Sequence, residues 1–264
     1  MKEMLAGETL EHLKPFGIVV KSRRQAADIE AFSIPLLKTL IDEHRVVILR
    51  GFAPLAGSAL PEFCRRLGEP LEWEFGTVNE LSVKPLAGNY LYTSRAVPFH
   101  WDGAFVGRIP RYIFFHCDAA PPRASGGETL FCDTLRLLAR ATPAERELWR
   151  RMAITYTTEK IVHYGGTFTS PLITRHPDTG EEVLRFAEPV EDLNPVRLKI
   201  EGIPESAQKD FLDDMHLRLN DESACYAHEW AEGDVLIADN HRLLHGRRAF
   251  TESAARRIRR VNIL

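Results

Sequence analysis

The arrangement of short apolar runs constrains the fold more than any other feature of this sequence. Strand-like runs recur along the chain and are separated by turns that contain glycine and proline. Helical patterns fall between some of these runs only, whereas a doubly wound parallel sheet needs regular strand–helix alternation. The pattern predicts an α+β or mainly β fold whose core is a double-stranded β-helix (jelly roll) with flanking and inserted helices. The predicted strands cover residues 45–50, 111–116, 183–186, 234–238 and 259–264.

Three segments show signs of helix. Residues 34–44 have apolar residues at helical spacing. Thr142 and Glu145 form the pattern of a capping box, with Pro143 at the first helical position. Apolar residues at helical spacing between 211 and 219 predict a further amphipathic helix, whose apolar face we interpret as core contacts.

Size and composition predict one folded domain over residues 1–264. The sequence is 44% hydrophobic and 27% charged, which is typical of a globular protein and excludes extensive disorder. The formal net charge is −3, and basic residues gather mainly in a late run between Arg256 and Arg260, so nucleic acid is not expected as a partner. We expect a small-molecule substrate instead; the oligomeric state is left open, with a homo-oligomer as one alternative.

The sequence also allows a prediction of the cellular localisation. No apolar run reaches the roughly 20 residues that a membrane-spanning helix needs. The four cysteines lie far apart without a CxxC pair, and the first 15 residues lack a signal-peptide pattern. We therefore expect a cytoplasmic protein with no membrane association.

The pattern His-x-Asp occurs three times, at residues 100–102, 116–118 and 176–178. Two residues that are two positions apart on a strand point to the same face, so each pair could offer a nitrogen and a carboxylate oxygen to one metal ion. With ten histidines and 37 acidic residues, about one His-x-acid match is expected by chance. The surrounding sequence must therefore choose among the three.

Context favours residues 100–102. Residues 176–178 precede Gly180 and have the composition of a tight turn. Residues 116–118 end an apolar strand, where a histidine is more often a hydrogen-bonded core residue than a ligand, and we keep them as the second choice. His100 and Asp102 instead stand where a strand opens into a loop, the position at which binding residues collect on rigid sheets.

A third metal ligand is expected from His245, which closely follows the buried run 235–238. Two imidazoles and one carboxylate on one face of an octahedron leave three positions open, which suits iron(II) that binds a chelating keto acid and O2. The same ligands could hold zinc for hydrolysis.

Three blocks of the sequence now resemble a known family, the taurine dioxygenase-like branch of the iron(II)/2-oxoglutarate oxygenases. The blocks are His100-Trp-Asp102, Ser125-Gly-Gly-Glu-Thr-Leu-Phe131, and the segment 239–260, which contains His245 and the late arginine run. The resemblance implies that His100, Asp102 and His245 bind Fe(II), with 2-oxoglutarate and O2 as co-substrates. Asp102 disfavours the related halogenases, which carry a small residue at this position.

The resemblance further implies that Thr129 and an arginine bind the distal carboxylate of 2-oxoglutarate, for which a guanidinium offers a planar two-point contact. Arg260 is the first choice and Arg256 its companion. If residues 256–264 enter a strand, Arg257 or Arg259 should face away.

Residues 100–105, 163–168 and 184–186 resemble the subgroup that processes tyrosine-derived isonitriles in bacterial secondary metabolism. On this reading the product is a vinyl isonitrile or a hydroxylated relative, and the motifs do not separate hydroxylation, desaturation and decarboxylation. The alternatives are a free amino-acid hydroxylase of the same family, a non-catalytic jelly-roll binding protein, and a zinc hydrolase. The expected substrate-binding residues are Tyr90, Tyr92, His163, Tyr164 and Arg185, with Arg185 pairing with a substrate carboxylate.

Overall fold

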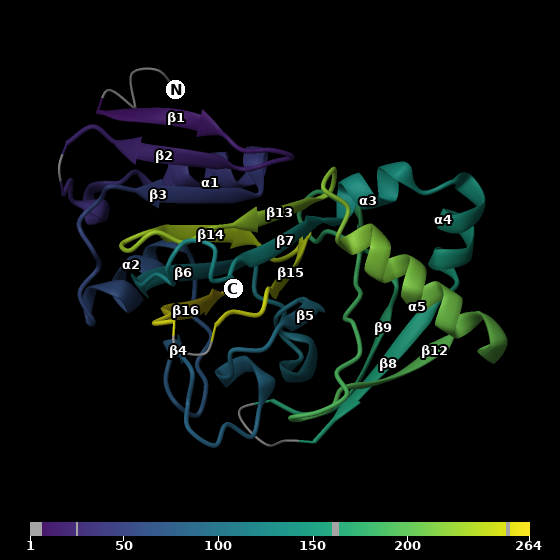
Figure 1. The fold of residues 1–264 in the computed structure, drawn as a ribbon. Coiled ribbons are helices and arrows are strands. Elements are labelled where there is room, and N and C mark those ends of the chain that lie inside the picture. Colours follow the sequence, from purple (N-terminus) through teal and green to yellow (C-terminus); the bar gives the residue numbers. More distant parts are fainter. Residues whose placement is uncertain (1–6, 25, 160–163, 252–253) are drawn as a thin grey trace.

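The computed structural model describes residues 7–24, 26–159, 164–251 and 254–264, which form a mixed fold of helices and strands (Figure 1). In the described residues the α-helices are α1 (Ile34–His44), α2 (Ala59–Leu67), α3 (Thr134–Arg140), α4 (Pro143–Arg150) and α5 (Glu205–Leu219). The strands are β1 (Glu8–His12), β2 (Ile18–Ser22), β3 (Val46–Arg50), β4 (Asn79–Leu81), β5 (Val97–His100), β6 (Tyr112–Ala119), β7 (Thr129–Asp133), β8 (Ala153–Thr158), β9 (Gly166–Pro171), β10 (Ile173–Arg175), β11 (Glu182–Leu184), β12 (Arg197–Glu201), β13 (Cys225–His228), β14 (Val235–Asp239), β15 (Leu243–Arg247) and β16 (Arg257–Ile263).

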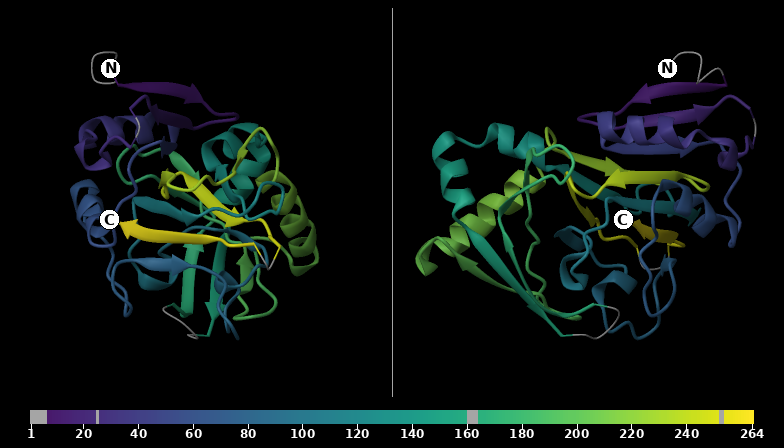
Figure 2. Two further views of the ribbon diagram at one scale, coloured as in Figure 1. Left: turned by 60° about the vertical axis from the view of Figure 1, so that its left-hand side comes forward. Right: turned by 180° about the vertical axis from the view of Figure 1, so that it is seen from behind.

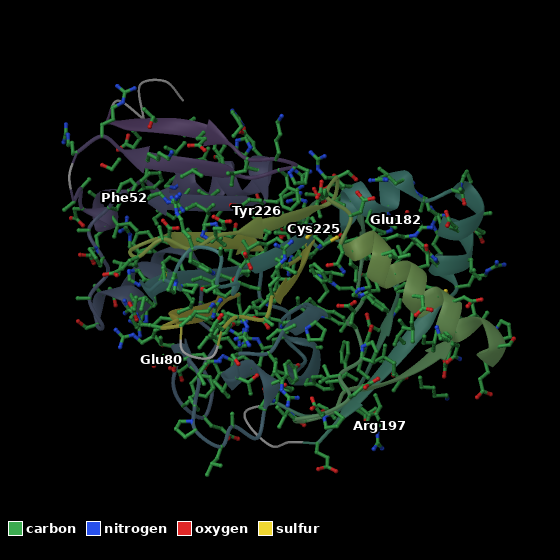
Figure 3. All side chains as sticks on the ribbon, viewed as in Figure 1. Phe52, Glu80, Glu182, Arg197, Cys225 and Tyr226 are labelled. Atoms are coloured by element: carbon green, nitrogen blue, oxygen red, sulfur yellow. The ribbon has the colours of Figure 1, made fainter. Side chains whose placement is uncertain are left out.

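Two sheets carry most of the strands. The larger has the order β1-β2-β3-β14-β6-β16-β4 and the smaller the order β13-β7-β15-β5. Figure 3 labels residues on one edge strand of each sheet, Glu80 on β4 of the larger and Cys225 and Tyr226 on β13 of the smaller. From β5 to β7, and again from β13 to β16, consecutive strands alternate between the two sheets. Residues far apart in sequence are thereby brought onto neighbouring strands.

Helices α1 and α2 cover the outer face of the larger sheet, as the rear view in Figure 2 shows. Ser33 caps α1 by accepting a hydrogen bond from the Leu36 amide, and the buried residues of the helix follow helical spacing. Strand β3 has four consecutive buried residues, because α1 covers one of its faces and the smaller sheet's side chains the other.

A second core lies between the two sheets. Phe115 on β6 packs edge-on against Phe131 on β7, with ring centroids 6.3 Å apart, and Trp230 lies 6.0 Å from Phe115. The opposite face of the smaller sheet packs against α3, α4, α5 and the three-stranded sheet β12-β8-β9, which gather at the end of the molecule away from β1 (Figures 1 and 2). The smaller sheet is therefore buried on both faces.

The structure confirms most of the elements that the sequence predicts. Helix α1 has the predicted bounds, the capping box opens α4, and the apolar residues between 211 and 219 lie in α5, which begins earlier at Glu205. The predicted strands correspond to β3, β6, β11, β14 and β16. Residues 177–179 form the expected turn, between β10 and β11. Within the described residues, no helix is long and apolar enough to cross a membrane.

The capping box of α4 allows a test of local stability. The Thr142 hydroxyl accepts from the Glu145 amide at 3.2 Å, and the Glu145 carboxylate accepts from the Thr142 amide at 2.6 Å. Thr142→Ala should lower the free energy of unfolding by about 1 kcal/mol, because it removes the cap. Urea denaturation followed by circular dichroism measures the change. Thr142→Ser keeps the hydroxyl and should retain most of the stability; equal losses in both variants would contradict the assignment.

Candidate metal centre and its two cavities

Two histidines 145 positions apart in sequence face each other across a pair of strands. His100 ends β5 and His245 lies in the middle of β15, and the two are direct partners in the antiparallel register. Partners of this kind place their side chains on the same face of the sheet. The two imidazole rings accordingly lie with their centroids 4.2 Å apart.

Asp102 reaches the same place from the loop after β5. The Asn240 side chain accepts from the Asp102 amide and donates to the Asp102 carbonyl, both at 3.0 Å, and donates to the Pro110 carbonyl at 2.8 Å. Gly103 makes the turn with φ +103°, and a Cβ there would lie 2.5 Å from the Arg108 carbonyl oxygen. The loop therefore closes tightly and fixes the direction of Asp102.

The three side chains converge as a metal-ligand set. Asp102 Oδ1 lies 3.7 Å from His100 Nε2 and 3.9 Å from His245 Nε2. Among the described residues, these three form the only group of three or more His, Cys, Asp and Glu whose ligand atoms all lie within 4.8 Å of one another. His100 Nδ1 contacts the Pro98 carbonyl at 2.9 Å, which leaves Nε2 for a metal. Both ring nitrogens of His245 are buried without a hydrogen-bond partner in the described structure.

The protonation states also suit metal binding. Burial lowers the pKa of His100 and lowers that of His245 further, so both rings are neutral near pH 7. Burial by itself would raise the pKa of Asp102, but the nearby Arg260 charge and the Asn262 hydrogen bond keep it below its usual value. Arg260 Nη1 lies 3.1 Å from Asp102 Oδ2, and the Asn262 side chain donates to the same oxygen at 2.9 Å.

The second-choice pair, residues 116–118, is not part of this centre. His116 Nδ1 lies 2.9 Å from Asp118 Oδ1, and the Arg259 guanidinium contacts both residues. The late arginines divide as the strand pattern predicts, because Arg257 is exposed and Arg259 turns to Asp118, whereas Arg256 and Arg260 are buried.

An inner cavity adjoins the metal centre. Its wall includes Leu91, Thr129, Arg247, Arg256, Arg260 and the two histidines. Arg256 donates from Nη2 to the Thr129 hydroxyl at 3.3 Å and from Nε to the Gly127 carbonyl at 3.1 Å. Trp230 also donates to that hydroxyl, at 3.0 Å. Burial lowers the pKa of Arg256 to about 9, so it is still charged at neutral pH.

This geometry reverses the order of the two arginines. The sequence-based first choice for the 2-oxoglutarate carboxylate was Arg260, but Arg260 pairs with Asp102 and has no hydrogen bond to Thr129. Arg256 is the arginine that contacts Thr129. The sequence alone could not rank them, because both residues lie in one basic run and nothing in the sequence shows which of them faces β7.

An outer cavity of about 80 Å³ also adjoins this centre, where His100, Asp102 and Arg260 form part of its wall. Most of its wall is aromatic or aliphatic, including Trp73, Leu91, Trp101, Phe105 and Val190. Its charged members are Asp102, Glu188 and Arg260, and Glu188 is already bonded to the Phe99 amide and to His216.

The structure describes four of the five expected substrate residues, and two of them line the outer cavity. Tyr90 and Tyr164 line the outer cavity, with hydroxyls 3.3 Å apart, and the Tyr164 hydroxyl accepts from Asn89 at 2.8 Å. Tyr92 lies outside the cavity wall, with its hydroxyl on Asn79. His163 falls outside the described residues.

Arg185, the fifth expected residue, does not line the outer cavity. It is buried away from the outer cavity and donates to the Asn240 carbonyl at 3.0 Å, so this placement does not support a role in pairing with a substrate carboxylate. Arg260 is the arginine of the cavity wall, and its Nε is buried without a hydrogen-bond partner in the described structure.

Sequence reasoning missed several residues that shape the site. Asn240 stands in a segment that was recognised, but nothing in the sequence shows that its side chain crosses to Asp102. Asn262 could have been found, because it is two positions after Arg260 on the same strand and therefore on the same face. No motif around Trp230 in the sequence indicates that its side chain contacts Thr129.

Comparison with known proteins places the chain in a family. Residues 10–262 match the family described as Taurine catabolism dioxygenase TauD, TfdA family. The chain belongs to this family. It is 46% identical to 3-((Z)-2-isocyanoethenyl)-1H-indole synthase of Fischerella ambigua, over 99% of this chain and 97% of that protein. It is 35% identical to Tyrosine isonitrile desaturase of Pseudomonas aeruginosa, over 94% of this chain and 87% of that protein.

Among solved structures, this TauD/TfdA family member resembles PvcB from Pseudomonas aeruginosa with a TM-score of 0.83 and 33% identity, covering 97% of this chain and 91% of PvcB. A further PvcB structure, described as that of an Fe, alpha-ketoglutarate dependent oxygenase from an isonitrile synthetic pathway, matches with a TM-score of 0.81 and 32% identity, over 97% and 92% of the two chains.

Asn262 provides a test of how the metal centre is held. Its hydrogen bond to Asp102 Oδ2 occupies the carboxylate oxygen that is farther from the histidines, so Asn262→Ala should lower iron(II) affinity about 10- to 100-fold. Anaerobic calorimetric titration with iron(II) measures the effect. Asn220→Ala, at the exposed end of α5, is the matched control and should bind iron(II) like the parent protein. Equal affinities in all three proteins would show that the bond does not orient Asp102.

Proposed function

We propose that this protein is an iron(II)- and 2-oxoglutarate-dependent oxygenase that converts an aromatic amino-acid-derived isonitrile into a vinyl isonitrile. The observation that carries the proposal is the convergence of His100, Asp102 and His245 between a basic inner cavity and an aromatic outer cavity. Two neutral imidazoles and one carboxylate suit iron(II) with open coordination positions. The unpartnered ring nitrogens of His245 fit this role, because a buried nitrogen without a partner is costly unless a ligand occupies it.

The inner cavity suits 2-oxoglutarate. A carboxylate in this cavity would receive a charge-assisted hydrogen bond from Arg256 and a hydrogen bond from the Thr129 hydroxyl. Trp230 donates to the same hydroxyl and so holds it in place. Both histidines line the same cavity as Arg256, so a keto acid bound to Arg256 would lie beside the metal ligands. Bound iron(II) and 2-oxoglutarate would together activate O2 for removal of a substrate hydrogen.

The outer cavity suits an aromatic acid. The ring would pack among the aromatic side chains, where Phe105 is already stacked on Tyr164 at 5.9 Å. Arg260, with one N–H unpartnered in the described structure, would bind the carboxylate and hold the adjacent carbons at the metal. The relative that is 46% identical is named for an indole product, and the 35% relative for tyrosine isonitrile. We therefore propose the tryptophan-derived isonitrile acid as the preferred substrate.

The proposed reaction balances. The isonitrile acid, 2-oxoglutarate and O2 give the vinyl isonitrile, succinate, two CO2 and one water. The hydrogen is lost from the carbon beside the ring, and the carboxylate leaves as CO2 when the double bond forms. The protein's part is to position the acid and to limit water, for which the aromatic wall of the outer cavity is suited.

We also infer that the two main sheets are the layers of a double-stranded β-helix. This is supported by the alternation of consecutive strands between the sheets and by the aromatic core that they share. Because that core is continuous with both sheets, we propose that residues 1–264 form one domain.

Product analysis tests the proposed function. Purified protein with iron(II), 2-oxoglutarate and O2 should convert the tryptophan-derived isonitrile acid faster than the tyrosine-derived one, with one succinate formed per vinyl isonitrile. His245→Ala should remain folded and form neither product, because one metal ligand is lost. Hydrolysis of the substrate without 2-oxoglutarate, with no vinyl isonitrile formed, would favour a zinc hydrolase, and turnover of free amino acids alone would favour an amino-acid hydroxylase. Absence of turnover with any of these substrates would favour a binding protein.

Substitutions of Arg256 and Arg260 should affect different kinetic constants, because the two residues are proposed to bind different ligands. Arg256→Met should raise the 2-oxoglutarate concentration needed for half-maximal rate about 10- to 100-fold, with a smaller effect on substrate KM, because a charge-assisted contact is lost. Arg260→Met should chiefly raise the substrate KM. Steady-state kinetics measures both, and iron(II) affinity is determined in parallel since Arg260 also pairs with Asp102. The opposite assignment of effects would restore Arg260 as the 2-oxoglutarate contact.

A further inference from the structure

Arg247 lines the inner cavity and is hydrogen-bonded to residues that line the outer cavity. It lies on β15 two residues after His245, is only 7% exposed, and forms part of the inner cavity wall. Its guanidinium donates to four backbone carbonyls of the segment 90–95, those of Tyr90 at 3.5 Å, Leu91 at 3.1 Å, Thr93 at 2.6 Å and Arg95 at 2.7 Å. A surface arginine would use water for these contacts, so this side chain is built into the fold as a clamp.

The loop that Arg247 holds belongs to the other cavity. Tyr90 and Leu91 line the outer cavity, and Leu91 lines both. Asn89, at the start of the same turn, is fully buried and donates to the Tyr164 hydroxyl. A change at Arg247 is therefore transmitted directly to the wall that would surround the substrate's ring.

Arg247 is also a buried cation without a counter-charge. None of the ion pairs of the described residues includes it, and burial lowers its pKa to about 10. Its Nε is buried and has no hydrogen-bond partner in the described structure. Its charge in turn lowers the pKa of Arg256, and both guanidinium groups lie over the Phe250 ring, at 5.2 and 5.8 Å.

We propose that Arg247 is a positioning residue that couples the two cavities, so that a dicarboxylate in the inner cavity strengthens substrate binding in the outer one. The inference rests on the proposed function. With the inner cavity empty, Arg247 and Arg256 repel each other and the spare N–H of Arg247 lacks an acceptor. A bound carboxylate neutralises this repulsion and holds the guanidinium in the orientation that clamps the loop.

The coupling is measured as a change in substrate affinity. The iron(II)-loaded protein is titrated anaerobically with the tryptophan-derived isonitrile acid, with and without saturating 2-oxoglutarate, by calorimetry. In the parent protein 2-oxoglutarate should tighten substrate binding about 5-fold or more. In Arg247→Met the ratio of the two affinities should fall close to one, while iron(II) still binds. Arg247→Lys keeps the charge but cannot reach all four carbonyls, so it should give an intermediate ratio.

Controls separate coupling from a loss of structure. Arg248→Met changes the exposed neighbour on the chain and should keep the parent ratio. A parent ratio in Arg247→Met, or in Arg247→Lys if the methionine variant does not fold, would overturn the proposal, as would a ratio of one in the parent. Failure of the parent protein to bind 2-oxoglutarate in the presence of iron(II) would instead refute the proposed function, and the coupling with it.

Discussion

The pairing of β15 with its two neighbours is the interaction on which the site depends. Opposite β5, His245 faces His100; opposite β7, it faces Phe131 and Arg247 faces Thr129. One strand thus sets the metal ligands and the wall of the inner cavity. A slip of one residue would turn both His245 and Arg247 to the other face of the sheet. The site therefore depends on the register of β15.

The pairing of β15 with β5 contains a β-bulge, which changes how closely the two strands approach each other. Between the pairs His245–His100 and Arg247–Val97, β15 has one residue and β5 has two. This bulge brings the β5 backbone close to Gly246, where a Cβ would lie 2.7 Å from the Val97 carbonyl oxygen. A glycine is therefore required between His245 and Arg247, because any side chain at position 246 would push the two strands apart.

The sequence predicted that His100, Asp102 and His245 come together, whereas it did not predict how the arginines around them are arranged, for a physical reason. His100 and Asp102 lie on one local segment, and His245 stands in a recognisable block, so motif order was enough to unite them. Arg185 could not be excluded in this way, because its position depends on how β11 packs beside the Asn240 turn. The order of Arg256 and Arg260 likewise depends on pairing with β6, whose register shifts just before Ile258.

The distribution of buried charge links the metal to both cavities. Arg247, Arg256 and Arg260 are each at most 7% exposed, and among them Arg260 alone has a carboxylate partner in the described residues, Asp102. Burying cations without partners costs stability, so the fold bears this cost for a ligand that brings negative charge. Since Arg260 lines both cavities and holds Asp102, an acid bound in either cavity acts on the same electrostatic network as the metal. The order in which co-substrate and substrate bind is then a property of that network rather than of either cavity alone.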